Sequence, residues 1–157
     1  MSDLTAGIPT ARELATHFMR MIQTGDFSDA ERVFSADVVT EWPQSNERIV
    51  GRDNLMAIFA NYPGGTIGGE PELHFTEAQQ AEYVMTPMFT VLKPTGTPDT
   101  ATGVTRARYP DGSEWYVVVF IRAHEGQIEH TENYFAPVYP APEWRAEWVQ
   151  PMETPSE

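Results

Sequence analysis

The residues of this chain that could do chemistry fall into a few short clusters. Arg106 and Arg108 stand two residues apart in a strand-like segment, so both guanidinium groups would share one face and could hold a carboxylate or an enolate. A solvated outer face is the alternative interpretation of this pair. His124 and His130 flank a turn, and two histidines are too few for a zinc site. We therefore interpret them as surface or hydrogen-bonded histidines.

The chain lacks the motifs of common catalytic and cofactor-binding sites. It contains no cysteine, which excludes disulfides, thiolate metal ligands and cysteine nucleophiles. It has no G-x-S-x-G nucleophile turn and no H-E-x-x-H metal motif. The glycine-rich stretch 64–69 lacks the Lys-Ser/Thr pair of a phosphate-binding loop, and a loop beside a cleft is the better interpretation. Spacing alone identifies no reaction, and we expect neither a metal nor an organic cofactor.

Composition narrows the class of protein and of partner. The 157 residues suffice for one domain, and 41% hydrophobic residues supply its core. Ten Lys and Arg against 23 Asp and Glu give a formal net charge of −13, which disfavours nucleic acid and anionic membrane surfaces as partners. No apolar run is long enough to span a membrane, and the first ten residues do not read as a secretory signal. We expect a soluble cytoplasmic protein.

The elements that must position these residues follow from hydrophobic periodicity and turn signals. Helices are predicted after capping boxes at 10–13 and 28–31, and after Gly51. Strands are predicted at 37–42, 88–92, 102–109, 114–122 and 127–135, with turns at 110–112 and 125–126. Segment 64–87 fits either a helix or a strand. This order predicts an α+β fold with three N-terminal helices on a curved, mostly antiparallel sheet.

The chain divides into one domain and a tail. Residues 1–136 are expected to form the domain, with 1–9 as a flexible lead, and 137–157 form a tail rich in Pro and Trp. Pro142 could open a short helix with Trp144 and Trp148 on one face, which either the chain's own domain or a partner subunit must cover. Since the last strands also carry many large side chains, we predict a homodimer that buries the outer sheet face with help from the tail.

Four short strings resemble the nuclear transport factor 2-like superfamily, and within it the SnoaL-like branch. They are Phe18-x6-Gly25-Asp26, Phe34-Ser-Ala-Asp-Val-Val, Ile49-Val-Gly51-Arg52-Asp53, and Glu125-Gly-Gln-Ile128 leading into Asn133-Tyr134-Phe135. The resemblance covers about residues 10–136 and implies a cone-shaped fold around a mostly apolar cavity, while the tail resembles those of uncharacterised bacterial members. Relatives include polyketide cyclases, ketosteroid isomerase, limonene epoxide hydrolase, dehydratases and non-catalytic binding domains, so the fold leaves the function open.

The resemblance implies a cavity without the catalytic groups of its best-known enzymes. Phe18 stands where ketosteroid isomerase has its tyrosine, Trp42 stands at its base, and Val118 or Val119 stands at its oxyanion donor. Limonene epoxide hydrolase needs an aspartate where this chain has Asn133. The residues expected to contact a substrate are Phe18, Trp42, Tyr62, Arg106 and Tyr116.

Catalysis in such a cavity would depend on Glu41, His74 and Asn133. Asn133 can hold a substrate oxygen but cannot transfer a proton, so Glu41 or His74 must be the acid–base group. We favour Glu41, because it lies near the base position of the isomerase and its apolar neighbour Trp42 would raise its pKa. The alternative interpretation is that the side chains of Glu41 and His74 are both exposed to solvent. The register of the strand decides whether Glu41 or Trp42 points into the cavity.

Two functions remain as alternatives. The first is an isomerase, cyclase or dehydratase that acts on a hydrophobic, oxygenated small molecule without a cofactor. The second is a non-catalytic small-molecule-binding or dimerisation domain, which the loss of both carboxylate arrangements favours. A buried Glu41 or His74 with a strongly perturbed pKa would favour the enzyme. A cavity whose polar groups are only Asn133 and tyrosine hydroxyls would favour binding.

Overall fold

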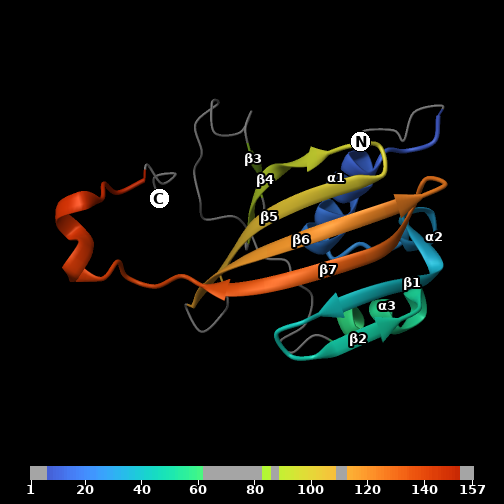
Figure 1. Ribbon diagram of the computed structural model, residues 1–157. Coiled ribbons are helices and arrows are strands. Elements are labelled where there is room, and N and C mark those ends of the chain that lie inside the picture. The colour runs from blue at the N-terminus through green and yellow to red at the C-terminus, as the bar shows by residue number, and fades with distance from the viewer. Residues whose placement is uncertain (1–6, 62–82, 86–88, 109–112, 153–157) are drawn as a thin grey trace.

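The computed structural model describes residues 7–61, 83–85, 89–108 and 113–152. In this part of the chain, helices lie on one face of a seven-stranded sheet with the strand order β2-β1-β7-β6-β5-β4-β3 (Figure 1). All neighbouring strands are antiparallel except β1 and β7, which are parallel. The prediction of an α+β fold with N-terminal helices and a mostly antiparallel sheet is confirmed.

The elements lie close to their predicted places. The helices are α1 (Ala11–Thr24), α2 (Ala30–Val33), α3 (Arg52–Ala60) and the 3-10 helix η1 (Glu143–Trp148). The strands are β1 (Phe34–Trp42), β2 (Glu47–Val50), β3 (Tyr83–Met85), β4 (Phe89–Gly96), β5 (Thr100–Arg108), β6 (Glu114–His124) and β7 (Gln127–Pro137). Short β2 is not among the predicted strands. Of the ambiguous segment 64–87, residues 83–85 form β3 and the rest lies outside the described residues.

Helix α1 begins and ends where the sequence predicts. The Glu13 amide donates to Thr10 Oγ1 (3.3 Å), and the Thr10 amide donates to Glu13 Oε2 (2.8 Å), so the predicted capping box is present. The helix ends at Gly25, whose φ of 67° lies in the left-handed region that suits glycine.

The capping box predicted at 28–31 is wrong, although a helix follows it. Helix α2 has Asp29 as its N-cap residue, without a side-chain hydrogen bond to the helix. Glu31 is thus only the second helical residue, which is too early for the reciprocal bond of a capping box. The Ser28 amide instead donates to Asp26 Oδ1 (3.0 Å) and forms a turn before the helix.

The apolar core lies between the helices and one face of the sheet, which we call the inner face. Its buried side chains come from α1, α2, α3 and five strands, and the largest fully buried apolar ones are Leu14, Val33, Phe34, Val38, Leu55, Val119 and Ile128. The rings of Phe18 and Phe34 meet edge to face at 5.0 Å between centroids. The opposite side of the sheet is the outer face.

A two-residue turn joins β6 and β7 as the sequence predicts. Glu125 and Gly126 have φ values of 49° and 78°, and both signs fit a type I′ hairpin turn. The turn predicted at 110–112 lies outside the described residues. Among the described helices, none is long and apolar enough to cross a membrane.

The C-terminal tail leaves the end of β7 and points away from the sheet (Figure 1). Its last described backbone bond to the sheet runs from the Val138 amide to the Glu114 carbonyl (2.9 Å). The short helix predicted after Pro142 is present as η1. Trp144 and Trp148 are 74% and 73% exposed, so their own domain does not cover them.

Candidate functional site

The inner face carries a polar row where β1 and β7 run in parallel. Thr40 pairs with Thr131 in the register of the two strands, and both side chains are buried. Thr131 Oγ1 donates to Thr40 Oγ1 (2.9 Å), and Asn133 Nδ2 donates to Thr131 Oγ1 (3.2 Å). We call Thr40, Thr131 and Asn133 the inner polar row. It is a chain of hydrogen bonds that ends in a carboxamide.

The carboxamide of Asn133 retains hydrogen-bonding capacity. Only 9% of the residue is exposed, and its one hydrogen bond within the described structure goes to Thr131. The amide oxygen and the second amide hydrogen therefore have no described partner. Apolar side chains surround the position: Val119 lies opposite on β6, and the rings of Trp42 and Phe135 meet edge to face at 6.0 Å.

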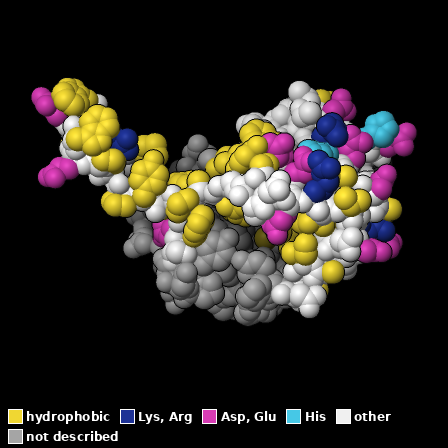
Figure 2. All heavy atoms as spheres, turned by 60° about the horizontal axis from the view of Figure 1, so that its bottom comes forward, with side chains coloured by type: hydrophobic (Ala, Val, Ile, Leu, Met, Phe, Trp, Pro, Cys, Tyr) yellow, Lys and Arg dark blue, Asp and Glu magenta, His cyan; other side chains and the backbone are white. Residues whose placement is uncertain are grey.

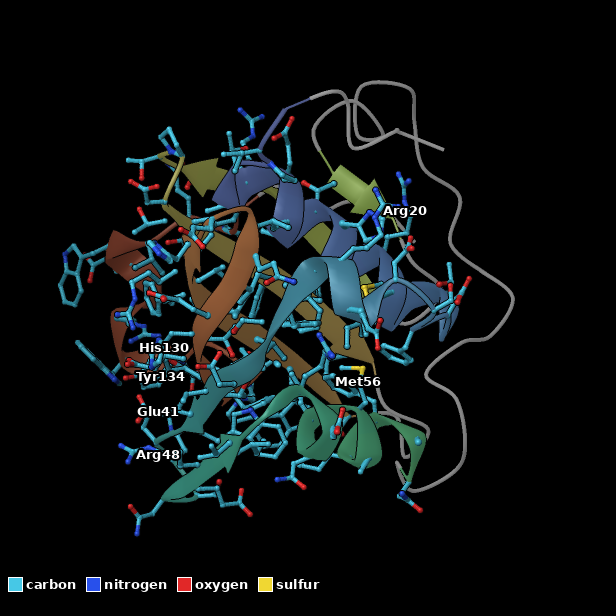
Figure 3. All side chains as sticks on the ribbon, turned by 90° about the vertical axis from the view of Figure 1, so that its right-hand side faces the viewer. Arg20, Glu41, Arg48, Met56, His130 and Tyr134 are labelled. Atoms are coloured by element: carbon cyan, nitrogen blue, oxygen red, sulfur yellow. The ribbon has the colours of Figure 1, made fainter. Side chains whose placement is uncertain are left out.

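The side chain of Glu41 lies on the outer face, opposite to the expected interior position. Thr40 and Trp42 point to the inner face, and neighbours along a strand alternate, which places Glu41 outside. Its carboxylate accepts hydrogen bonds from Arg48 (2.7 and 2.9 Å) and pairs with His130 Nε2 (3.0 Å). Figure 3 shows Glu41, Arg48 and His130 together on the side of the sheet away from the helices.

The electrostatics of Glu41 also differ from the expectation. Hydrogen bonds from Arg48 and then His130 favour the ionised carboxylate and lower the pKa of Glu41. The predicted rise of this pKa is therefore wrong in direction, because Trp42 packs on the other face and cannot desolvate the carboxylate. A carboxylate held ionised by an arginine is poorly suited to donate a proton near neutral pH.

The charged residues around Glu41 line a hollow of about 430 Å³ on the outer face. We call it the outer hollow, and its lining residues are Asp37, Val39, Glu41, Arg48, Val50, Arg122, Glu129 and His130. Arg122 Nε donates to Glu129 Oε1 (2.6 Å) across the strands β6 and β7. In Figure 2, basic, acidic and histidine side chains gather on the side of the molecule away from the tail.

The other residues expected at the site are divided between the faces. Phe18 and Trp42 contribute to the inner core together with Asn133. Arg106 and Tyr116 form a cross-strand pair on the outer face, since the neighbouring Thr105 is buried on the inner face. Arg106 forms an ion pair with Glu114. Tyr62 and His74 lie outside the described residues.

Sequence reasoning missed the two threonines of the inner polar row and the partners of Glu41. Alternation along 38–42 puts Glu41 on the face opposite to Val38 and Thr40, but Val39 lies on the face of Glu41, so the pattern does not say which face is buried. No local signal could have paired Glu41 with His130, because 89 residues separate them. Among the described residues, no group of histidines and carboxylates is placed to hold a metal ion.

Comparisons with known proteins agree with this architecture. The family model of the SnoaL-like domain matches residues 15–131. No curated protein matches the chain. An NTF2-like protein of unknown function from Burkholderia xenovorans LB400 has a similar structure, with a TM-score of 0.70, 26% identity, and coverage of 91% of this chain and 95% of that chain.

Two further solved structures show the same fold at lower identity. A protein from Kribbella flavida DSM 17836, described as a candidate ketosteroid isomerase, has a TM-score of 0.68 at 20% identity, covering 92% of this chain and 90% of that one. An NTF2-like protein of unknown function from Mesorhizobium loti has a TM-score of 0.58 at 20% identity, covering 80% and 89%. The chain belongs to the SnoaL-like domain family of the nuclear transport factor 2-like superfamily.

Proposed function

We propose that this chain binds a hydrophobic small molecule that carries a carbonyl or hydroxyl oxygen, with Asn133 as its hydrogen-bonding contact. The observation that supports the proposal is the carboxamide of Asn133, nine-tenths buried with one donor and one acceptor unused among the described residues. A ligand oxygen placed beside the carboxamide would accept from its unused amide hydrogen, and one such hydrogen bond is worth about 1 kcal/mol net.

The inner polar row fixes the orientation of this contact. The hydrogen bond to Thr131 holds one side of the Asn133 amide, and Thr131 is held in turn by Thr40. A side chain whose rotamer is already fixed loses little entropy when a ligand binds. The aromatic rings of Trp42 and Phe135 beside it offer apolar contact area to the rest of the ligand.

The chemistry of the described inner face favours binding over proton transfer. Its buried polar side chains are Thr40, Thr105, Thr131 and Asn133, and none of them titrates near neutral pH. Glu41, the favoured acid–base group, lies on the outer face with a lowered pKa. These observations support the non-catalytic alternative, in which the domain captures its ligand and leaves it unchanged.

A matched pair of ligands tests the role of Asn133. Decalin and 2-decalone have the same apolar rings and differ by one carbonyl oxygen, so their affinity ratio isolates the polar contact. We expect the wild-type chain to bind 2-decalone about two- to tenfold more tightly in calorimetric titrations, the range of one net hydrogen bond. Asn133→Leu should reduce that ratio to near one, whereas the exposed control Asn54→Leu should leave it unchanged. An unchanged ratio in Asn133→Leu would remove Asn133 from the proposal.

Deuterium exchange separates binding from an isomerase-type reaction, the activity named for the neighbour from Kribbella flavida. Such a reaction begins by removing a proton beside a carbonyl group, so an enzyme would speed deuterium uptake by 2-decalone in heavy water. We expect uptake at the rate of a buffer control, measured by mass spectrometry. Faster uptake would favour the enzyme and make His74 the residue to substitute next.

A further inference from the structure

The tail presents a run of uncovered apolar side chains. Tyr139, Trp144, Trp148 and Met152 are between 69% and 81% exposed, and Val138 and Val149 are also exposed. Trp144 has the guanidinium of Arg145 over its ring at 5.9 Å. In Figure 2 hydrophobic side chains follow the tail out from the body of the molecule. Large aromatic side chains in this state usually mark a surface that binds another protein.

The outer face carries a second uncovered apolar surface. Phe120 and Tyr134 meet edge to face at 6.1 Å and remain 47% and 37% exposed. Val50 at the rim of the outer hollow is 55% exposed. In the described part of the chain, the apolar side chains of the tail and those of the outer face are therefore both exposed.

We propose that the tail, residues 138–152, docks on the outer face of a second copy of this chain, with Trp144 and Trp148 at the outer hollow. A two-fold arrangement lets each copy contribute one tail and one outer face. This interface does not depend on the proposed ligand at Asn133, since it uses the opposite face of the sheet.

The tail starts too far from the outer hollow of its own domain to cover it without reversing direction. The hollow includes Glu129 and His130 near the start of β7, whereas the tail leaves from its end at Pro137. Seven strand residues separate His130 from Pro137, a distance of roughly 23 Å. To return, the chain would have to reverse within residues 138–142, where Pro140 and Pro142 restrict the backbone. The tail instead continues away from the sheet (Figure 1).

Two arginines of the outer hollow can also contact the tail, beside the carboxylates Glu41 and Glu129 with which they already form ion pairs. Arg48 and Arg122 line the hollow with side chains that are 66% and 57% exposed. The tail brings Glu143 and Glu147 in the same short helix as its tryptophans. A guanidinium can bind a carboxylate and can also lie over an indole ring, so both kinds of side chain in η1 find a partner at the hollow.

The area is sufficient for a stable dimer. Trp and Tyr side chains bury roughly 150–250 Å² each, so Tyr139, Trp144 and Trp148 together offer roughly 400 Å² per tail at their present exposure. Two tails and the surfaces beneath them would then bury roughly 1,600 Å², which falls in the range of stable protein interfaces.

Engineered disulfides test this contact directly, because the native chain has no cysteine. A tagged chain carrying Ala146→Cys in η1 is mixed with an untagged chain carrying Val50→Cys at the hollow and is oxidised mildly. We expect a cross-linked pair of tagged and untagged chains. As a control, the untagged chain carries Ala57→Cys, on the exposed side of α3, in place of Val50→Cys. We expect this mixture to give at least tenfold less of the cross-linked pair. Equal yields from the two would overturn the proposal.

A chain that carries both Ala146→Cys and Val50→Cys shows whether the outer hollow is covered by the tail of a second copy or by the tail of the same chain. We expect covalent dimers, and a disulfide formed mainly within one chain would show that the tail covers its own domain. Light scattering of the wild-type chain should give twice 17.7 kDa at micromolar concentration. The double variant Trp144→Ala, Trp148→Ala should weaken the dimer at least tenfold, and a monomeric wild type or an unaffected dimer would refute the role of the tail.

Discussion

Replacement of Asn133 by aspartate would place a carboxyl group at the end of the inner polar row with almost no change of size. The position is 9% exposed and lies beside Val119, Trp42 and Phe135. The hydroxyl of Thr131 accepts from Asn133 and donates to Thr40, so it would have to turn away from Thr40 to donate to the new carboxyl group. Burial with so little hydrogen bonding favours the neutral form and raises the pKa of the new carboxyl group above its ordinary value of about 3.9.

The sign of the resulting pH dependence follows from proton uptake on folding. In the unfolded chain of Asn133→Asp the carboxyl group ionises at its ordinary pKa, and in the folded chain it ionises only at higher pH. Stability is therefore unaffected by this group below its ordinary pKa, and it is lost progressively as the pH rises from that value to the raised pKa of the folded state. Above that pH, we expect a loss of about 3 kcal/mol, within the cost of burying a charge with one weak partner.

Thermal unfolding measured by circular dichroism reports this loss. For a chain of this length, about 3 kcal/mol corresponds to a decrease in Tm of about 6–12 °C. We expect the deficit of Asn133→Asp relative to the wild type to be complete at about pH 8 and small at about pH 3.5, which is below the ordinary pKa of about 3.9. Asn133→Leu loses the same hydrogen bond without a titratable group, so its deficit should be equal at both pH values. An equal deficit for Asn133→Asp at both values would show that water reaches the position and would refute its shielding from solvent.

Three further predictions concern the frame around the site. Thr10→Ala removes the hydroxyl that accepts from the Glu13 amide and donates to Glu13 Oε2, and it should cost about 1 kcal/mol in chemical denaturation. Gly126→Ala forces a side chain onto a residue with φ of 78° and into contact with the chain before α1, so its Tm should decrease, and an unchanged Tm would contradict this turn geometry. Glu41→Gln should destabilise the chain at about pH 7, because the lowered pKa of Glu41 reflects stabilisation of the ionised form by Arg48. That difference should decrease as the pH falls below the ordinary pKa of 4.5 and vanish below the lowered pKa of folded Glu41, and a difference that persists in stronger acid would mean that charge is not its cause.

Local signals in the sequence were enough for the elements and their order. The capping box at Thr10, the left-handed Gly25 and the Glu125-Gly126 turn all act within a few residues, and the structure confirms each of them. The box predicted at 28–31 is wrong because α2 begins one residue later than the pattern implied. Differences of one or two positions at the ends of a helix are beyond what periodicity resolves.

The candidate site depends on side-chain direction, which the sequence pattern left open. Strand β1 carries apolar residues on both faces, with Val38 inside and Val39 outside, so its hydrophobic pattern does not assign Glu41 to a face. The structure assigns Glu41 to the outer face, and the residues that hold it there come from β2 and from β7 far along the chain. Such partners are brought together by the sheet topology, which no local pattern encodes.

The parallel pairing of β1 with β7 has a consequence for how the chain acquires its structure. Phe34 pairs with Ile128 and Thr40 pairs with Thr131, so β1 finds its central neighbour 91 residues further along the chain. Closure of so long a loop costs entropy before any contact repays it, and contacts of high sequence separation slow folding. Until then, β1 has β2 as a partner on one edge and an open edge on the other. The inner polar row spans this pairing, so its bond between Thr131 and Thr40 forms only once β7 has docked on β1.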